Sequence, residues 1–100
     1  MNEFGIKALR YWEVYRPQAL KRIGTPQEVE VYFTNLGMQI QQRAVELKVA
    51  MANRAPISED YSEQVGYLNQ AHASANEQAL LELAYLEPEP GREQMEMPRV

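Results

Sequence analysis

The chain contains no cysteine among its 100 residues and only one histidine, His72. The missing cysteines exclude disulfides, thiolate nucleophiles and every cysteine-based zinc or iron-sulfur site. A lone histidine leaves carboxylates as the other metal ligands, and no glutamate is followed three residues later by histidine, as in carboxylate-bridged bundles. We therefore expect no metal site and no cofactor. A cytoplasmic location fits the absence of cysteine.

Long hydrophobic runs are also missing. Nowhere do eighteen apolar residues follow one another, and the N-terminal MNEFGIK lacks a positive segment followed by an apolar run of secretory length. We therefore expect no membrane partner. The chain has no glycine-rich phosphate loop, no GxSxG and no HExxH. Because the reaction classes that these motifs carry are unsupported, we expect a protein that is not an enzyme.

Positive charge is scarce in the second half of the chain. Residues 59–100 carry nine acidic side chains against two arginines, whereas residues 1–24 carry five basic against two acidic side chains. The net charge of the whole chain is −4. Such asymmetry steers partners through the surface potential, so the basic end can pair with an acidic patch on another copy.

The clearest helix signal is TPQE. Thr25 can cap a helix, Pro26 suits its first position, and Glu28 completes a capping box. Apolar residues then recur every three or four positions, which predicts one long helix as far as about Asn53. They are Val29, Phe33, Leu36, Ile40, Ala44, Leu47 and Met51. Gly37, inside this helix, marks either a close approach of another backbone or a tolerated weak point.

A second long helix is predicted after the linker NRAPIS, in which Pro56 disfavours helical backbone. Ser58 can cap it, and it should end near Leu86 because Pro88 and Pro90 follow. Its predicted buried row is Tyr61, Val65, Leu68, His72, Ala75 or Asn76, Ala79, Leu83 and Leu86. A short linker between two long helices implies an antiparallel hairpin.

His72 would need a nucleophile and an orienting carboxylate nearby to act as a general base. Its helical neighbours three and four residues away are Leu68, Asn69, Ala75 and Asn76. These supply amides at best. We therefore interpret His72 as a histidine packed or hydrogen-bonded in the seam of the hairpin.

The N-terminal GIKALRYWEVYRP predicts a first helix with Ile6, Leu9 and Trp12 on one side. Pro17 then marks either a break or the start of a new helix, and QALKRI forms a short further helix. Because a two-helix hairpin leaves one long side bare, this first helix should pack across it with Trp12 as its buried anchor. The predicted fold is an all-α bundle over residues 1–87, followed by a flexible, acidic, proline-containing tail at residues 88–100.

The long helix also carries apolar residues away from its main row. They are Val31, Met38, Val45, Val49 and Ala52. A helix that is apolar over more than one seam is buried on two sides. We therefore expect this second face to be covered either by the first helix or by a second copy, and we expect self-association.

Basic and aromatic residues alternate in ALRYWEVYRPQALKR, a pattern that can hold phosphates and stack on bases. An amphipathic helix with buried aromatics and solvated basic residues looks the same, and the acidic net charge argues against a dedicated nucleic-acid binder. The residues that we expect to make exposed partner contacts are Arg10, Arg16, Arg22, Asn69 and His72.

Three blocks of sequence stand out together: residues 5–20 (GIKALRYWEVYRPQAL), 42–52 (QRAVELKVAMA) and 65–86 (VGYLNQAHASANEQALLELAYL). In this order they resemble the transposon-encoded protein TnpV family, small helical proteins of bacterial mobile elements. The closing helix of that family has the pattern V-x-x-[LM]-N followed by A-x-E-x-x-L-x-E-L. The matching residues are Val65, Leu68, Asn69, Ala75, Glu77, Leu80, Glu82 and Leu83.

The chain departs from this family in its proline-bearing linker and in having little sequence before Phe4. No role of the family's longer N-terminal segment is therefore carried over. The resemblance implies a mobile-element origin and supplies no site residue.

The expected function is that of a non-enzymatic accessory or regulatory protein of a phage, plasmid or transposon, which binds a protein partner through helix faces. One alternative is an accessory DNA-binding protein that uses the basic N-terminal helix. Another is a small inhibitor of a host defence nuclease, in which the acidic C-terminal half imitates nucleic acid.

Overall fold

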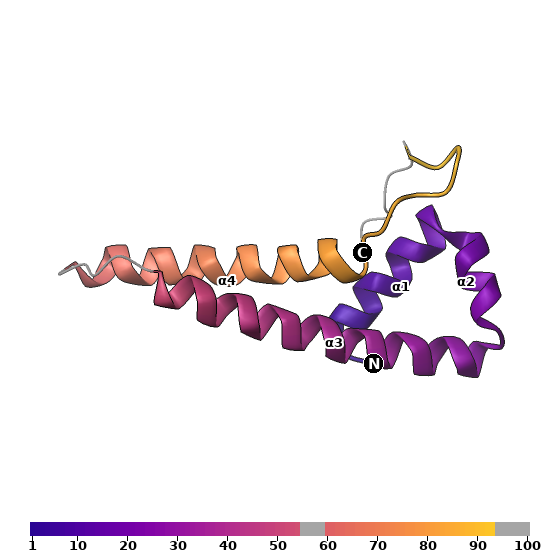
Figure 1. Cartoon of the computed structure of the whole chain (residues 1–100), viewed down its shortest axis with the longest axis horizontal. Coiled ribbons are helices and arrows are strands. Elements are labelled where there is room, and N and C mark those ends of the chain that lie inside the picture. Colours follow the sequence, from indigo (N-terminus) through magenta and orange to yellow (C-terminus); the bar gives the residue numbers. More distant parts are fainter. Residues whose placement is uncertain (55–59, 94–100) are drawn as a thin grey trace.

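The computed structural model describes residues 1–54 and 60–93. These residues form four α-helices: α1 (Glu3–Tyr15), α2 (Pro17–Ile23), α3 (Pro26–Asn53) and α4 (Tyr61–Leu83). Helices α3 and α4 run antiparallel as a long hairpin, and α1 packs at one end of it beside the short α2 (Figure 1). The predicted all-α bundle is confirmed, and its outline is elongated, at 53 × 28 × 22 Å.

The local signals around α3 act as predicted. The Thr25 hydroxyl oxygen accepts a hydrogen bond from the Glu28 backbone N–H at 3.2 Å, and the Glu28 carboxylate accepts one from the Thr25 backbone N–H at 3.3 Å. Helix α2 starts at Pro17, also as predicted. Helix α4 is capped by Asp60, whose side chain accepts from the Ser62 N–H at 2.9 Å. The predicted cap, Ser58, lies outside the described residues.

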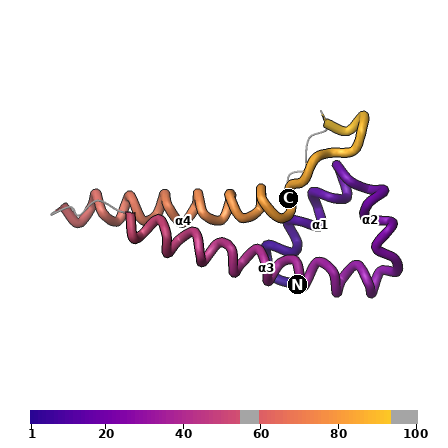
Figure 2. Tube along the Cα trace, in the orientation of Figure 1, coloured from indigo at the N-terminus to yellow at the C-terminus, as the bar shows by residue number. Residues whose placement is uncertain are grey.

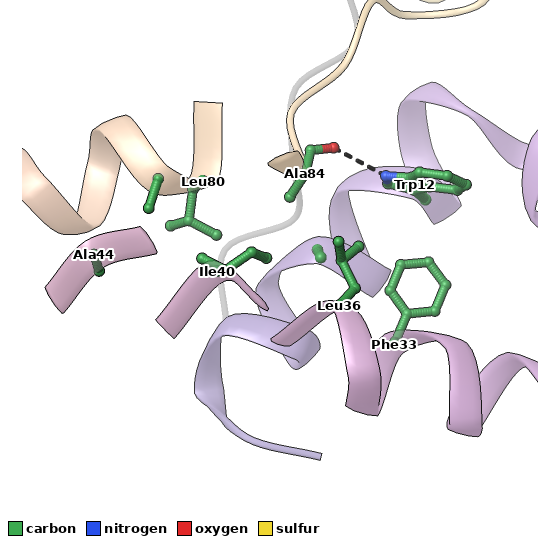
Figure 3. Packing of buried hydrophobic residues seen from close by; sticks show 9 residues of the cluster. Trp12, Phe33, Leu36, Ile40, Ala44, Leu80 and Ala84 are labelled. Carbon is green, nitrogen blue, oxygen red and sulfur yellow. Dashed lines mark hydrogen bonds between the residues drawn. The ribbon is translucent and has the colours of Figure 1, made fainter. Parts of the chain in front are cut away.

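The core lies where α1 crosses the hairpin (Figure 3). Phe33 and Ile40 of α3 are its largest fully buried side chains. The Trp12 ring meets the Phe33 ring edge-on at 5.3 Å, and its indole N–H donates to the Ala84 carbonyl at 2.9 Å. Trp12 is thus the predicted anchor. The predicted core row of α3 is also confirmed, because Leu36 and Ala44 are buried with Phe33 and Ile40.

Gly37 marks a close approach of two backbones. A Cβ atom at Gly37 would lie 2.8 Å from the Gly5 nitrogen and 3.0 Å from the Gly5 Cα atom. A Cβ atom at Gly5 would lie 2.5 Å from the Phe33 carbonyl oxygen. The first turn of α1 therefore crosses α3 at a distance that only two glycines permit. Of the two readings of Gly37, the structure supports the close approach.

The crossing also decides which side of α1 is buried. Gly5, Ala8 and Trp12 face the core, whereas Ile6 is 42% exposed and does not belong to the buried side as predicted. The prediction followed hydrophobicity. In the structure the small residues of α1 face α3 instead, because the two helices approach each other most closely there.

The seam between α3 and α4 differs in part from the predicted one. Ala75 and Ala79 are buried on α4 as predicted, but Ala71 is buried in place of His72, which is exposed, and Tyr61 is 80% exposed. The prediction that the imidazole lies in the seam is therefore wrong. A helical row that passes through residue 71 contains mostly the same other residues as one that passes through residue 72. The spacing of apolar residues alone therefore could not show which of the two positions is buried. Burying an imidazole costs free energy unless its nitrogens are hydrogen-bonded, whereas a methyl group fits between closely spaced helices.

Helix α4 ends at Leu83, three residues before the predicted end at Leu86. The chain then continues as a strap, residues 84–93, which passes the C-terminal end of α1 and turns back near its own end (Figure 2). The Glu89 N–H donates to the Tyr15 carbonyl at 2.8 Å, and the Arg92 guanidinium donates to the Val14 carbonyl at 2.8 Å. Residues 88–93 thus differ from the flexible tail that we expected. Residues 94–100 lie outside the described part of the chain.

Candidate protein-binding surface

The five predicted contact residues do not form one site. Arg10, which is partly buried, and Arg22, which is exposed, belong to α1 and α2 at the core end. Asn69 and His72 are exposed on α4. The structure separates them into two regions, so no common site arises from this set.

Arg16, which is partly buried, makes several contacts within the chain. Its guanidinium lies over the Trp12 ring, 4.7 Å from the ring centroid, and donates to the Glu87 carbonyl at 2.8 Å. Its Nε atom is buried without a hydrogen bond. Arg16 therefore fixes the strap to α1.

The aromatic rings next to Arg16 are engaged in the same way. The Tyr11 ring lies 4.5 Å from the Tyr15 ring and 4.8 Å from the Tyr85 ring, and its hydroxyl donates to the Leu86 carbonyl at 2.7 Å. Burial is the main cause that raises the pKa of Tyr11. These rings and Arg16 belong to the surface that could bind nucleic acid, and in the structure they make contacts within the chain.

Glu89 closes the strap onto α2. Its carboxylate accepts hydrogen bonds from the backbone N–H groups of Gln18 and Ala19 at 3.1 and 2.9 Å. Partial desolvation raises the pKa of Glu89, but these two hydrogen bonds and the charges of Arg16 and Arg22 outweigh it and hold the pKa below its ordinary value. Sequence reasoning missed this contact, because no local pattern links residues about seventy positions apart.

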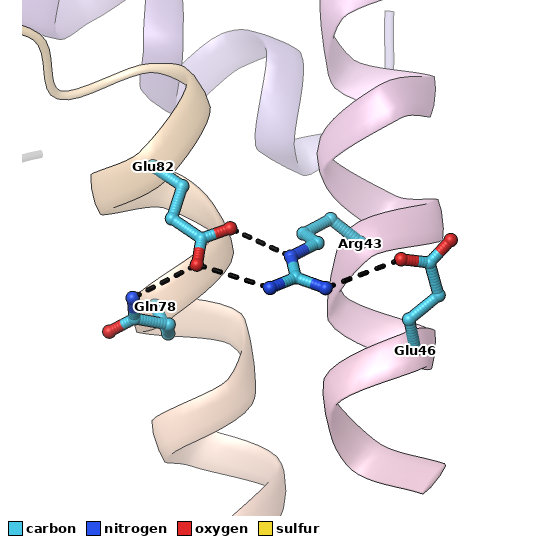
Figure 4. A network of polar contacts seen from close by, with 4 residues as sticks. All are labelled: Arg43, Glu46, Gln78 and Glu82. Atoms are coloured by element: carbon cyan, nitrogen blue, oxygen red, sulfur yellow. Dashed lines mark hydrogen bonds and ion pairs between the residues drawn. The ribbon is translucent and has the colours of Figure 1, made fainter. Parts of the chain in front are cut away.

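A polar network joins the two helices of the hairpin (Figure 4). The Arg43 guanidinium donates to the Glu82 carboxylate at 2.7 and 3.3 Å and to Glu46 at 3.4 Å, while the Gln78 amide donates to Glu82 at 3.1 Å. The hydrogen bonds from Arg43 and Gln78 lower the pKa of Glu82. The network links α3 to α4 across the hairpin.

The outer stripe of α3 is the most distinctive free surface. Val31, Met38, Val45 and Val49 are exposed by 60, 56, 51 and 55%, and Ala52 continues their line. These five residues lie opposite the buried row of α3, at 3.6 residues per turn. Sequence analysis found this second apolar face. The first helix does not cover it, so that alternative is wrong and the second copy stays a prediction.

Shallow hollows flank the outer stripe at its N-terminal end. One, of about 480 Å³, lies between α2 and α3, and a second, of about 300 Å³, adjoins it. The residues that line both are Gln27, Val31 and Asn35, with Ile23 of α2 forming one wall of the larger hollow. An apolar side chain from outside can insert next to Val31 there.

Charges along α3 are sorted by position. The N-terminal end carries Glu28 and Glu30, the middle carries the paired Arg43 and Glu46, and the C-terminal end carries Lys48 and Arg54. Glu30 and Lys48 make no ion pair with any residue in the described ranges. The stripe therefore has an acidic end and a basic end.

Residues 1–54 and 60–93 contain no candidate metal cluster and no candidate membrane-spanning helix. Within these ranges no group of three or more histidine, aspartate or glutamate side chains is arranged to hold a metal ion. No helix in the same ranges has both the length and the apolar character needed to cross a membrane.

Comparisons with protein-family models, curated proteins and solved structures find no match to this chain. The resemblance to the TnpV family therefore stays a prediction.

Proposed function

We propose that the protein is a non-enzymatic accessory or regulatory protein that binds another protein through the outer stripe of α3. The observation that carries this proposal is a line of large apolar side chains, each more than half exposed, along one helix. A line of exposed apolar side chains on one helix face can serve as an interaction surface, and a helix face is a common recognition element. The assignment to a bacterial mobile element rests on the TnpV resemblance alone.

The exposed area sets the scale of the binding energy. Burying the free half of Val31, Met38, Val45 and Val49 contributes roughly 1 kcal/mol each, or about 4 kcal/mol together. Loss of translational and rotational freedom on association costs at least as much. The stripe alone is therefore too weak, and the hollows and charges beside it must contribute to any stable complex.

The proposal is tested by a charge placed in the middle of the stripe. The Met38→Glu variant should no longer capture the protein that wild type captures from host lysate, because burying a carboxylate without a partner in the interface costs free energy. Leu81→Glu is the matched control, since Leu81 is 50% exposed on α4, away from the stripe. Equal capture by wild type and Met38→Glu would contradict the proposal.

A further inference from the structure

We infer that the outer stripe of α3 binds a second copy of this chain, with the two α3 helices packed antiparallel around Met38. This inference rests on the proposed function and names its partner. Three independent features of α3 support it: the spacing of the stripe, the order of its charges, and the position of the hollows.

The spacing of the stripe specifies a helical partner. Val31, Met38, Val45 and Ala52 are each separated by seven residues. A seven-residue apolar repeat stays in contact with a partner only when two helices wind around each other, because a straight helix drifts by about 20° per heptad. The stripe runs over about 32 Å at 1.5 Å of rise per residue. A second α3 helix has the matching length and the matching repeat.

The positions of the valines permit an antiparallel arrangement as well as a parallel one in register, so the direction of pairing is set by the charges. Val31 and Val45 both lie seven residues from Met38. A twofold axis at Met38 therefore places Val31 of each copy opposite Val45 of the other. Such an arrangement is closed, and every contact occurs twice.

The charges select the antiparallel direction. In the antiparallel pair, Glu30 of one copy lies near Lys48 of the other, and Glu46, which lies opposite Glu30, is already paired with Arg43. In a parallel pair each lysine would face its own counterpart, and so would each glutamate. Opposite charges across an interface fix its register, and like charges oppose it.

The hollows then receive side chains from the partner. With Met38 on the axis, Val49 of one copy lies opposite Gln27 of the other. Gln27 lines both hollows beside Val31, next to Ile23. A projecting valine thus meets the two hollows that border Val31.

The area implies a weak and reversible dimer. Two helix faces about 32 Å long and about 10 Å wide bury roughly 640 Å² in total, which is below the about 1,000 Å² of a specific, stable interface. The dimer should therefore form at micromolar to submillimolar concentrations and dissociate on dilution.

Sedimentation equilibrium of the full chain over a range of concentrations measures this directly. Wild type and Leu81→Glu should pass from monomer to dimer together. Met38→Glu should raise the dissociation constant more than tenfold, with unchanged helix content by circular dichroism. A wild-type protein that is monomeric at about 500 µM would overturn the inference, and so would a dimer unaffected by Met38→Glu.

Disulfide trapping then tests the direction of pairing, which is simple because the native chain has no cysteine. A mixture of Val31→Cys and Val45→Cys chains should form the mixed disulfide, because only the antiparallel pair brings these positions within bridging distance. Met38→Cys should bond to its own counterpart and serves as the control for oxidation. Self-coupling of Val31→Cys at the rate of Met38→Cys would overturn the antiparallel arrangement.

The two proposals fail separately. A monomeric protein whose lysate partner is lost in Met38→Glu would overturn the dimer and leave the proposed function in place. A wild-type dimer that is dissociated by Met38→Glu, with no effect of this change on lysate capture, would support the dimer and confine the stripe to self-association.

Discussion

The two ends of the α3–α4 hairpin are built differently. At the core end, α1, α2 and the strap surround the hairpin, and both of the largest fully buried side chains, Phe33 and Ile40, are found there. At the distal end only α3 and α4 meet (Figure 1). Their contact there depends on alanines and on Met51 beside Tyr67, and a shallow hollow of about 280 Å³ remains between the two helices. Packing, and with it local stability, therefore decreases along the hairpin.

This difference bears on the inferred dimer. The distal end carries Val45, Val49 and Ala52, and no third helix supports it. An antiparallel partner would place its own core end, with Val31 and α2, beside this distal end. Each copy would thus supply the helix that the other lacks.

The largest effect should come from shortening a core side chain. Phe33→Ala should lower the free energy of unfolding by about 3–5 kcal/mol, because Phe33 is fully buried against Trp12. Met51→Ala, at the partly buried distal seam, should cost about 1 kcal/mol. Urea titration followed by Trp12 fluorescence measures both. Equal costs at the two ends would show that the hairpin is packed uniformly.

Two glycines offer a sharper test, because the same substitution should have opposite signs. Gly37→Ala should destabilise by about 1–3 kcal/mol, since the new methyl group meets the Gly5 backbone. Gly66→Ala, on α4 with nothing within 4 Å, should stabilise by about 0.5–1 kcal/mol through helix propensity. Thermal unfolding of both variants gives the comparison. A stabilising Gly37→Ala would contradict the close crossing of α1 over α3.

A smaller effect is expected from acid at the core end. The pKa of Glu89 is lowered from 4.5, so its contribution to stability is complete above that value and is lost as pH falls through the lowered pKa. Trp12 reports on this, because its indole N–H is bonded to Ala84 at the start of the strap. Its fluorescence should change below about pH 4.5 in wild type.

Glu89→Gln should remove this acid transition and give the strap-released fluorescence already at neutral pH. Glu87→Gln is the matched control, because the strap uses the backbone carbonyl of Glu87 and not its side chain. An acid transition retained in Glu89→Gln would show that another group holds the strap.

These contrasts also show what the sequence could reveal. Both ends of α3 were predictable, because the capping box and the three-and-four spacing are local patterns that a helix uses directly. Trp12 was predictable as an anchor from its size. The choice of Ala71 over His72 depended on how closely two helices approach, and that distance is set by residues on both. The hydrogen bonds of Glu89 to α2 join segments that are far apart in the sequence, and no local sequence pattern predicts such a contact.

The outer stripe lies between these cases. Its apolar residues were visible in the sequence, because they fall on one helix face. The sequence did not show what covers that face, because a chain with the same pattern can either bury the face internally or expose it to a partner. The three-dimensional position of α1, fixed by the Gly5 and Gly37 crossing, separates the two alternatives.

The smallest effect should come from the Arg43–Glu82 pair, which joins the helices where the core end gives way to the distal end. Arg43→Gln should lower thermal stability less than any change above, because both side chains are about one-third exposed and salt screens their attraction. Its effect should instead be local. Amide hydrogen exchange should accelerate at residues 46–53 and 61–70 and stay unchanged around Phe33, since the pair is the only ion pair between α3 and α4 among the described residues.

Glu3→Gln, which breaks the Lys7 pair within α1, is the control and should leave the exchange rates of the distal amides unchanged. Faster exchange at both ends in Arg43→Gln would mean that the hairpin opens as one unit and that its two ends share their stability after all.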